Sequence, residues 1–187
     1  YIGGSMNLKQ KKARASKMSS ITLELRKRCW PDIDSKPLWK RTEKDGYTTM
    51  PRTMPQIFQI MDHLAPKGTP VSQTYLCLWC RVFDESMVTI ENEREMASEA
   101  GFNGQRAVTT WHSRMKNLIE LGFIEAIAGP AGKYQYVLIL NPYTIIKELE
   151  KEKKIPQELF IALFSRAQKV GAADDLKEDS PPNVTNF

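Results

Sequence analysis

The sequence predicts a mainly α-helical fold that contains a small β-hairpin, and three observations carry this prediction. Apolar residues recur at helical spacing through most of residues 53–170. A short β-branched run at 88–90 precedes two helical segments, and a Gly-Pro-Ala-Gly turn at 129–132 separates two further β-rich runs. With 187 residues, 41% of them hydrophobic, the chain is long enough to build one domain with a sizeable core.

Residues 88–140 form the central unit of this prediction. In chain order we expect a strand at 88–90, a helix at 92–100, a turn at 101–104, a second helix at 105–121, and strands at 123–127 and 134–140. This order is that of a winged helix-turn-helix with extra flanking helices. In that arrangement the second helix ordinarily enters the DNA major groove.

Flanking helices are expected from apolar spacing at 55–65, 71–84, 143–153 and 157–170. The last of these is more apolar than a lone surface helix needs to be. It either completes the core together with 55–65 or buries its apolar face against a second subunit, and we expect the helices of 143–170 to join two copies. Residues 171–187 are acidic and predict a disordered tail, so that the expected winged-helix domain spans 53–170.

Residues 1–52 are expected to form a basic arm and linker, in which 1–5 resemble a cloning remnant. Residues 7–52 hold 13 Lys and Arg against 5 Asp and Glu, whereas 53–187 hold 14 against 17. We expect 7–17 to be disordered when free, 21–29 to form a short helix and 34–52 to form a loop. The candidate phosphate-binding residues of the arm are Lys9, Lys11, Lys12, Arg14, Lys17, Arg26, Lys27 and Arg28.

Two alternatives stay open for this arm. A solubilising tail explains the charge as well as phosphate binding does. Trp39 and Tyr47 interleave with basic residues, a pattern that can stack on nucleic acid or pack the arm onto the domain, and packing is the preferred interpretation.

The second central helix has two separate faces at 100° per residue. Its core face is expected to carry Val108, Trp111, Met115, Leu118 and Ile119. The opposite face lacks carboxylates until Glu120 and carries Arg106, Thr109, Thr110, Ser113 and Asn117, with Lys116 at its edge. Such a face suits phosphates and base edges.

The residues beside this face complete the candidate DNA-binding set. Gln105 and Arg106 are expected in the first helical turn, where bidentate contacts to adenine and guanine originate. Asn103 is expected to cap the helix, with direct DNA contact as the alternative, and Lys133 lies at the hairpin tip. The preceding helix is acidic, which argues against dense phosphate contact there: Glu91, Glu93, Glu95 and Glu99 outnumber Arg94.

The unit resembles bacterial winged helix-turn-helix DNA-binding proteins, namely MarR-like regulators and the winged domains of plasmid and phage replication initiators. The resemblance covers residues 71–140. It rests on the turn at 100–103, the helix that begins Gln105-Arg106, and the segment 118–124, where Leu-Gly-Phe-Ile leads into the hairpin. It implies a transcriptional regulator or a replication or maintenance factor, although the wing is shorter and less basic than in many such proteins.

No constellation predicts a catalytic or metal site. Cys77 and Cys80 form a C-x-x-C inside an apolar helix, without a second ligand pair, and Cys29, His63 and His112 are distant in sequence. Buried thiols are the preferred interpretation. We expect no cofactor, no small-molecule effector, no membrane span and a cytoplasmic location.

The sequence therefore predicts a non-enzymatic, homodimeric protein that binds double-stranded DNA. The alternative is a winged-helix module for protein–protein interaction that does not bind DNA directly.

Overall fold

The computed structural model describes residues 8–176, with side chains from residue 19 onward. The described part is mainly helical and contains one three-stranded antiparallel sheet, which confirms the predicted class. The chain divides into two compact units, Tyr1–Gly46 and Tyr47–Phe187. The expected boundary was 52/53; residues 47–52 belong with the second unit, where Trp79 Nε1 donates a hydrogen bond to the Thr49 carbonyl at 2.8 Å.

The first unit contains helix α1 (Leu8–Cys29) and two short 3-10 helices, η1 (Ile33–Ser35) and η2 (Arg41–Glu43). The expected disorder at 7–17 is wrong for residues 8–17, which are helical. The physical reason is intrinsic propensity, because 8–29 contains neither Gly nor Pro and is rich in Leu, Lys, Arg, Ala and Glu or Gln. An apolar period is not needed for a helix with that composition.

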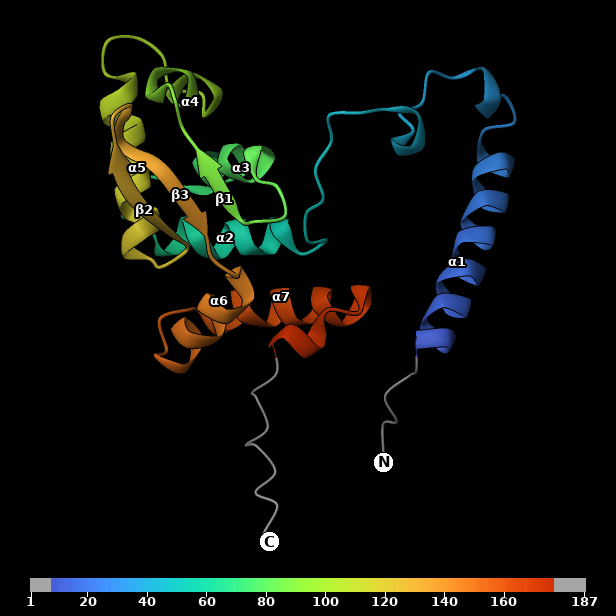
Figure 1. Ribbon diagram of the computed structural model, residues 1–187. Helices are drawn as coiled ribbons and strands as arrows, with labels where there is room; N and C mark the ends of the chain where they lie inside the picture. Colours follow the sequence, from blue (N-terminus) through green and yellow to red (C-terminus); the bar gives the residue numbers. More distant parts are fainter. Residues whose placement is uncertain (1–7, 177–187) are drawn as a thin grey trace, which may run out of the picture. The chain divides into compact units, whose positions relative to one another are not determined.

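The second unit holds the remaining elements (Figure 1). They are α2 (Met54–Leu64), α3 (Ser72–Arg81), β1 (Met87–Thr89), α4 (Glu93–Glu99), α5 (Ala107–Glu120), β2 (Ile124–Gly129), β3 (Gly132–Ile139), α6 (Pro142–Lys151), α7 (Gln157–Val170) and η3 (Ala173–Leu176). Each helix and strand expected in 53–170 is present, with its ends shifted by a few residues at most.

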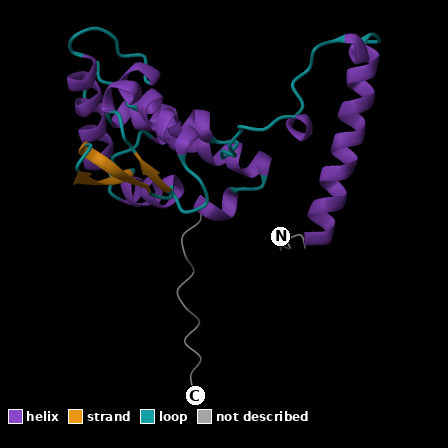
Figure 2. Ribbon diagram, turned by 45° about the horizontal axis from the view of Figure 1, so that its top comes forward, coloured by secondary structure: helices purple, strands orange, loops and turns teal. Residues whose placement is uncertain are grey.

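The three strands, orange in Figure 2, are ordered β1-β3-β2. Val88 pairs with Val137, and Ile124 pairs with Ile139. These four side chains are buried, whereas their neighbours in the strands are exposed. The sheet therefore contributes one face to the core, as the period of two in a half-buried antiparallel sheet requires.

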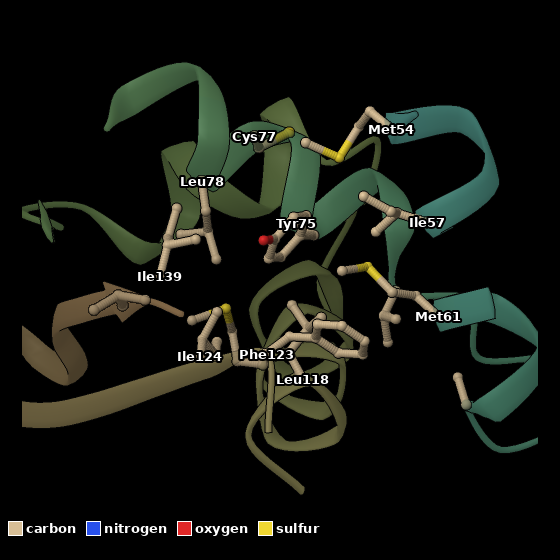
Figure 3. Packing of buried hydrophobic residues seen from close by; sticks show 14 of the residues in the cluster. Met54, Ile57, Met61, Tyr75, Cys77, Leu78, Leu118, Phe123, Ile124 and Ile139 are labelled. Carbon is tan, nitrogen blue, oxygen red and sulfur yellow. The ribbon is translucent and has the colours of Figure 1, made fainter. Parts of the chain in front are cut away.

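The core lies between this sheet face and helices α2, α3 and α5. Figure 3 shows Tyr75 among the side chains of Leu78, Met61 and Phe123. The Tyr75 ring meets the Phe123 ring edge to face, with centroids 6.2 Å apart, and burial raises the pKa of the Tyr75 hydroxyl. The Asp62 carboxylate accepts from Val71 N at 2.7 Å and Ser72 N at 2.9 Å, which fixes the start of α3 against α2.

Helices α6 and α7 complete this core. Helix α7 packs on α2, and its Leu163 and Ala167 have no exposed surface. The hydroxyl groups of Thr53 and Tyr143 form a buried hydrogen bond between the start of α2 and α6. Of the two alternatives left open for this segment, core completion is therefore the correct one, and the buried faces in 143–170 do not serve to join two copies.

The disorder expected from residue 171 onward is wrong for residues 173–176. Residues 173–176 form η3, which contacts α6 and α7, and Leu176 is buried. Leu176 is the buried apolar residue of η3, and it lies within an otherwise acidic sequence. The acidic composition therefore gives no indication that η3 packs on α6 and α7. Residues 177–187 lie outside the described residues.

Substituting Leu163→Ala should lower the free energy of unfolding by about 2–5 kcal/mol, because it removes fully buried methyl groups and leaves a cavity. Ile161→Ala, two residues away on α7 and 53% exposed, should change it by less than about 0.5 kcal/mol. Urea denaturation of both variants checks this. Equal effects would mean that α7 does not complete the core.

Candidate nucleic-acid interface

The core side of α5 sets the orientation of the whole helix. Trp111 and Leu118 have no exposed surface, whereas Thr109, Ser113 and Lys116 are exposed on the opposite side. We call these three exposed residues the α5 ridge. The predicted core face is confirmed for Trp111, Met115 and Leu118 and is wrong for Ile119, which is 36% exposed because one helical step carries it 100° away from Leu118.

The expected DNA-facing role of Asn117 is wrong. Asn117 is 7% exposed, and its Nδ2 donates to Thr69 Oγ1 at 3.1 Å. Thr69 belongs to the loop between α2 and α3, which covers this flank of α5. Thr110, on the same flank, is half-buried. A helical projection cannot show this loop, because it lies 48 residues away in the sequence.

The turn before α5 also differs from expectation. The helix begins at Ala107, so Gln105 and Arg106 lie in the preceding turn rather than in the first helical turn. Arg106 occupies the capping position, no side chain caps the helix there, and Asn103 is not its cap. Gly104 adopts φ +82°, a left-handed conformation that delays the helix start.

Asn103, Gln105 and Arg106 are nevertheless all exposed, at the end of α5 from which the ridge starts. The first helical turn keeps its amide N–H groups free of side-chain acceptors. This end of α5 therefore combines an exposed guanidinium, two exposed amide side chains and the positive end of the helix dipole.

Arg114 is a residue of this region that sequence reasoning missed. Its guanidinium carbon lies 5.5 Å from the centroid of the Phe102 ring, and burial lowers the pKa of Arg114. Phe102 belongs to the turn between α4 and α5. The contact thus ties the turn to the second helix, and the twelve-residue separation gave no sequence signal for it.

The acidic side of α4 is largely paired. Arg81, at the end of α3, forms ion pairs with Glu99 and with Glu95, and its Nε donates to Glu99 Oε2 at 3.1 Å. Hydrogen bonds to Glu99 and then Glu95 raise the pKa of Arg81. Two of the four glutamates that argue against phosphate contact near α4 are therefore paired with a cation from α3. The negative charge of this region is smaller than the sequence alone suggests.

A third glutamate, Glu93, connects α4 to both α5 and β3. Its Oε2 lies 2.7 Å from His112 Nε2, and its Oε1 accepts from Tyr134 N at 3.4 Å. The Tyr134 ring packs edge to face against the rings of His112 and Trp111, at centroid distances of 5.2 and 5.8 Å. This cluster holds the hairpin on α5.

Lys133, the candidate residue of the hairpin, is exposed, and its Nζ lies 5.2 Å from the Tyr134 ring centroid. It is thus attached to the same cluster that fixes α5. Its neighbour Gly132 allows the approach of Glu93, because a Cβ at Gly132 would lie 2.5 Å from Glu93 Oε1.

The candidate phosphate-binding residues of the basic arm all belong to helix α1. Arg26, Lys27 and Arg28 are exposed in the last turn of α1. Lys9, Lys11, Lys12, Arg14 and Lys17 lie on the same helix, with side chains outside the described residues. Trp39 and Tyr47 are 64% and 47% exposed. Packing of the arm onto the domain and stacking on nucleic acid both stay predictions.

The cysteines do not form a site in the part of the chain that the structure describes. Cys77 is buried, and desolvation, with a further contribution from Glu99, raises the pKa of its thiol. Cys29 and Cys80 are exposed, so buried thiols were the right interpretation for Cys77 alone. Within residues 8–176 no three His, Cys, Asp or Glu side chains gather as metal ligands, and no helix has the length and apolar character of a membrane span.

Comparison of the chain with protein-family models, with curated proteins and with solved structures gives no significant match.

Substituting Gly132→Ala should displace the Glu93 carboxylate and break its bond to Tyr134 N. The expected loss in unfolding free energy is about 1–3 kcal/mol, because a partly buried acceptor loses its partner and an alanine at φ +157° is strained. Thermal or urea unfolding measures it. Ala131→Ser, at the exposed neighbouring position of the hairpin, is the control and should stay within about 0.5 kcal/mol; an unchanged Gly132→Ala would contradict the role of Glu93.

A thiol reagent applied to the native protein at about pH 8 should label Cys29 and Cys80 quickly and Cys77 only after unfolding, because burial and a raised pKa both suppress the Cys77 thiolate. Mass spectrometry of digested protein identifies the labelled positions. Rapid labelling of all three cysteines would contradict the packing of α3.

Proposed function

We propose that this chain binds double-stranded DNA, with the α5 ridge and the turn at 103–106 in the major groove. The elements α3, β1, α4, α5, β2 and β3 follow one another in the order of a winged helix-turn-helix, in which a hairpin such as β2 and β3 follows the recognition helix, and this order supports the proposal. The single observation that carries the proposal is the ridge itself, which lies opposite a fully buried face.

The α5 ridge and the turn at 103–106 together suit the two kinds of contact that a recognition helix makes. Arg106 and Gln105, at the exposed N-terminal end, have side chains that reach guanine and adenine edges. Thr109 and Ser113 offer hydroxyl groups for phosphates or bases. Lys116 Nζ lies 3.4 Å from the Glu120 carboxylate; because both side chains are more than half exposed, this pair is weak, and a phosphate can replace the carboxylate.

The helical arm adds a second electrostatic element to the proposal. With 22 residues, α1 extends about 33 Å, close to the length of one DNA turn. It carries eight Lys and Arg against Glu24 alone. We assign residues 9–17 to phosphates that flank the site bound by α5, where each neutralised phosphate releases counterions.

The biological role that goes with this activity is that of a transcriptional regulator or of a replication or maintenance factor of a bacterial or mobile element, acting in the cytoplasm as a homodimer. The resemblance to winged helix-turn-helix proteins supports this role. Two copies related by a twofold axis would occupy half-sites about 34 Å apart.

A winged-helix module for protein–protein interaction is the second candidate. It is favoured by the exposed apolar side chains on the sheet, of which Ile127 is 69% and Met87 is 49% exposed. DNA binding and a protein contact on the sheet use different surfaces, so both can belong to one protein.

Fluorescence anisotropy of a labelled duplex, titrated at rising salt, tests the proposal. Binding at about 50 mM salt is expected, and deletion of residues 7–17, which removes five Lys and Arg, should reduce the slope of log K against log salt by up to about 4.5. No binding at this salt would refute the DNA proposal. Binding with an unchanged slope would refute the assignment of the arm alone.

Substituting Arg106→Ala should cost about 1–3 kcal/mol on a duplex selected from a random pool and less on random duplexes, because a base contact is lost. Lys169→Ala removes one exposed charge on α7 and should leave both affinities unchanged. Anisotropy measures all four affinities. An equal loss on both duplexes would make Arg106 a phosphate contact.

A further inference from the structure

The outer face of the sheet is apolar at its centre and uncovered. It consists of two rows of directly paired residues: Met87, Leu138 and Glu125 form one row, and Thr89, Tyr136 and Ile127 form the other. All six are exposed, from 38% at Tyr136 to 69% at Ile127 among the four apolar side chains. We call these six residues the outer sheet face.

The surroundings of this face extend its apolar area and give it a negative charge. Phe83, 83% exposed, lines a shallow hollow of about 500 Å³ together with Met87 and Thr89. Asp84 and Glu85 follow Phe83 and are exposed, and Glu125 lies in the face itself. Contiguous apolar area of this kind, bordered by charge, marks an interaction surface.

The C-terminal half of α1 has the complementary chemistry. Ile21 and Leu25, one helical turn apart on the same side, are 50% and 59% exposed. Arg28 is one turn further along that side, and Arg26 and Lys27 flank it. Among the residues of α1 whose side chains the structure describes, Ile21, Leu23 and Leu25 are all exposed and gain no stability from packing, which is where most helical stability in proteins originates.

We propose that the outer sheet face binds a second copy of this chain, through residues 21–29 of that copy's α1. The match is apolar at the centre, with Ile21 and Leu25 against Met87, Leu138 and Ile127. It is oppositely charged at the border, with Arg28 and its neighbours facing Glu125, Asp84 and Glu85.

A twofold dimer makes this contact twice, so that each copy covers the other's sheet and has its own helix covered. The apolar faces of α6 and α7 are buried within one chain and are not free to join two copies. Residues 9–17 stay outside the contact. The proposal is independent of DNA binding, and its test contains no DNA.

Analytical ultracentrifugation of the full chain over a concentration series tests the proposal with two matched pairs of variants. Ile127→Lys on the sheet and Leu25→Lys on the helix should each raise the dimer dissociation constant at least about tenfold, since each places a charge in the apolar centre. Ile161→Lys, on α7, and Leu23→Lys, about 200° around α1 from Leu25, replace exposed residues of the same type, 53% and 45% exposed, and should leave it unchanged. Circular dichroism confirms that each variant is folded.

The outcomes separate the possible occupants of the face. Loss of the dimer in both test variants but in neither control supports the proposal. A wild-type chain that stays monomeric, or a dimer that survives Ile127→Lys, overturns it. If the chain is monomeric but binds a synthetic peptide of residues 18–30, a second copy is not the partner of the outer sheet face. This result would assign the face to a basic helix of another protein.

Discussion

The burial of one side of α5 is the constraint on which the rest of the second unit depends. Trp111, Met115 and Leu118 are completely enclosed, so a rotation of the helix by even one residue would bring a polar side chain into the core. Three contacts then fix the flanks of the helix from three other segments. Asn117 bonds to Thr69, Arg114 lies over Phe102, and His112 meets Glu93. The exposed ridge is what remains after these contacts are made.

Pairing between neighbouring elements determines the charge that surrounds this ridge. Arg81 from α3 accompanies Glu95 and Glu99, and Glu93 is occupied by α5 and β3. The Glu93 contacts that help to position α5 therefore also moderate the acidity of α4, and Arg81 moderates it further from α3. Stability and the chemistry of the surface are coupled at Glu93, because this one side chain serves both.

Much of the fold could be predicted from the sequence, because periodic burial determines where elements lie. The 3.6-residue period located α2 to α7, and the Gly-Pro turn located the hairpin. What failed depends on contacts between distant segments. A helical projection predicts an exposed Asn117 because its partner Thr69 lies in a distant loop. The sequence predicts Asn103 as a cap because the left-handed Gly104 that moves the helix start is indistinguishable in sequence from an ordinary turn residue. The helix at 8–17 was missed because propensity alone, without an apolar face, supports it.

The central claim is that DNA lies against the α5 ridge. A photo-crosslinker attached to Ser113→Cys, in a chain with Cys29→Ser and Cys80→Ser, tests it most directly, because Ser113 is at the middle of the ridge and exposed. We expect efficient crosslinking to a bound duplex from this position and none from the same group at Ile161→Cys on α7. Crosslinking from Ile161→Cys, with none from Ser113→Cys on a duplex that is demonstrably bound, would contradict it.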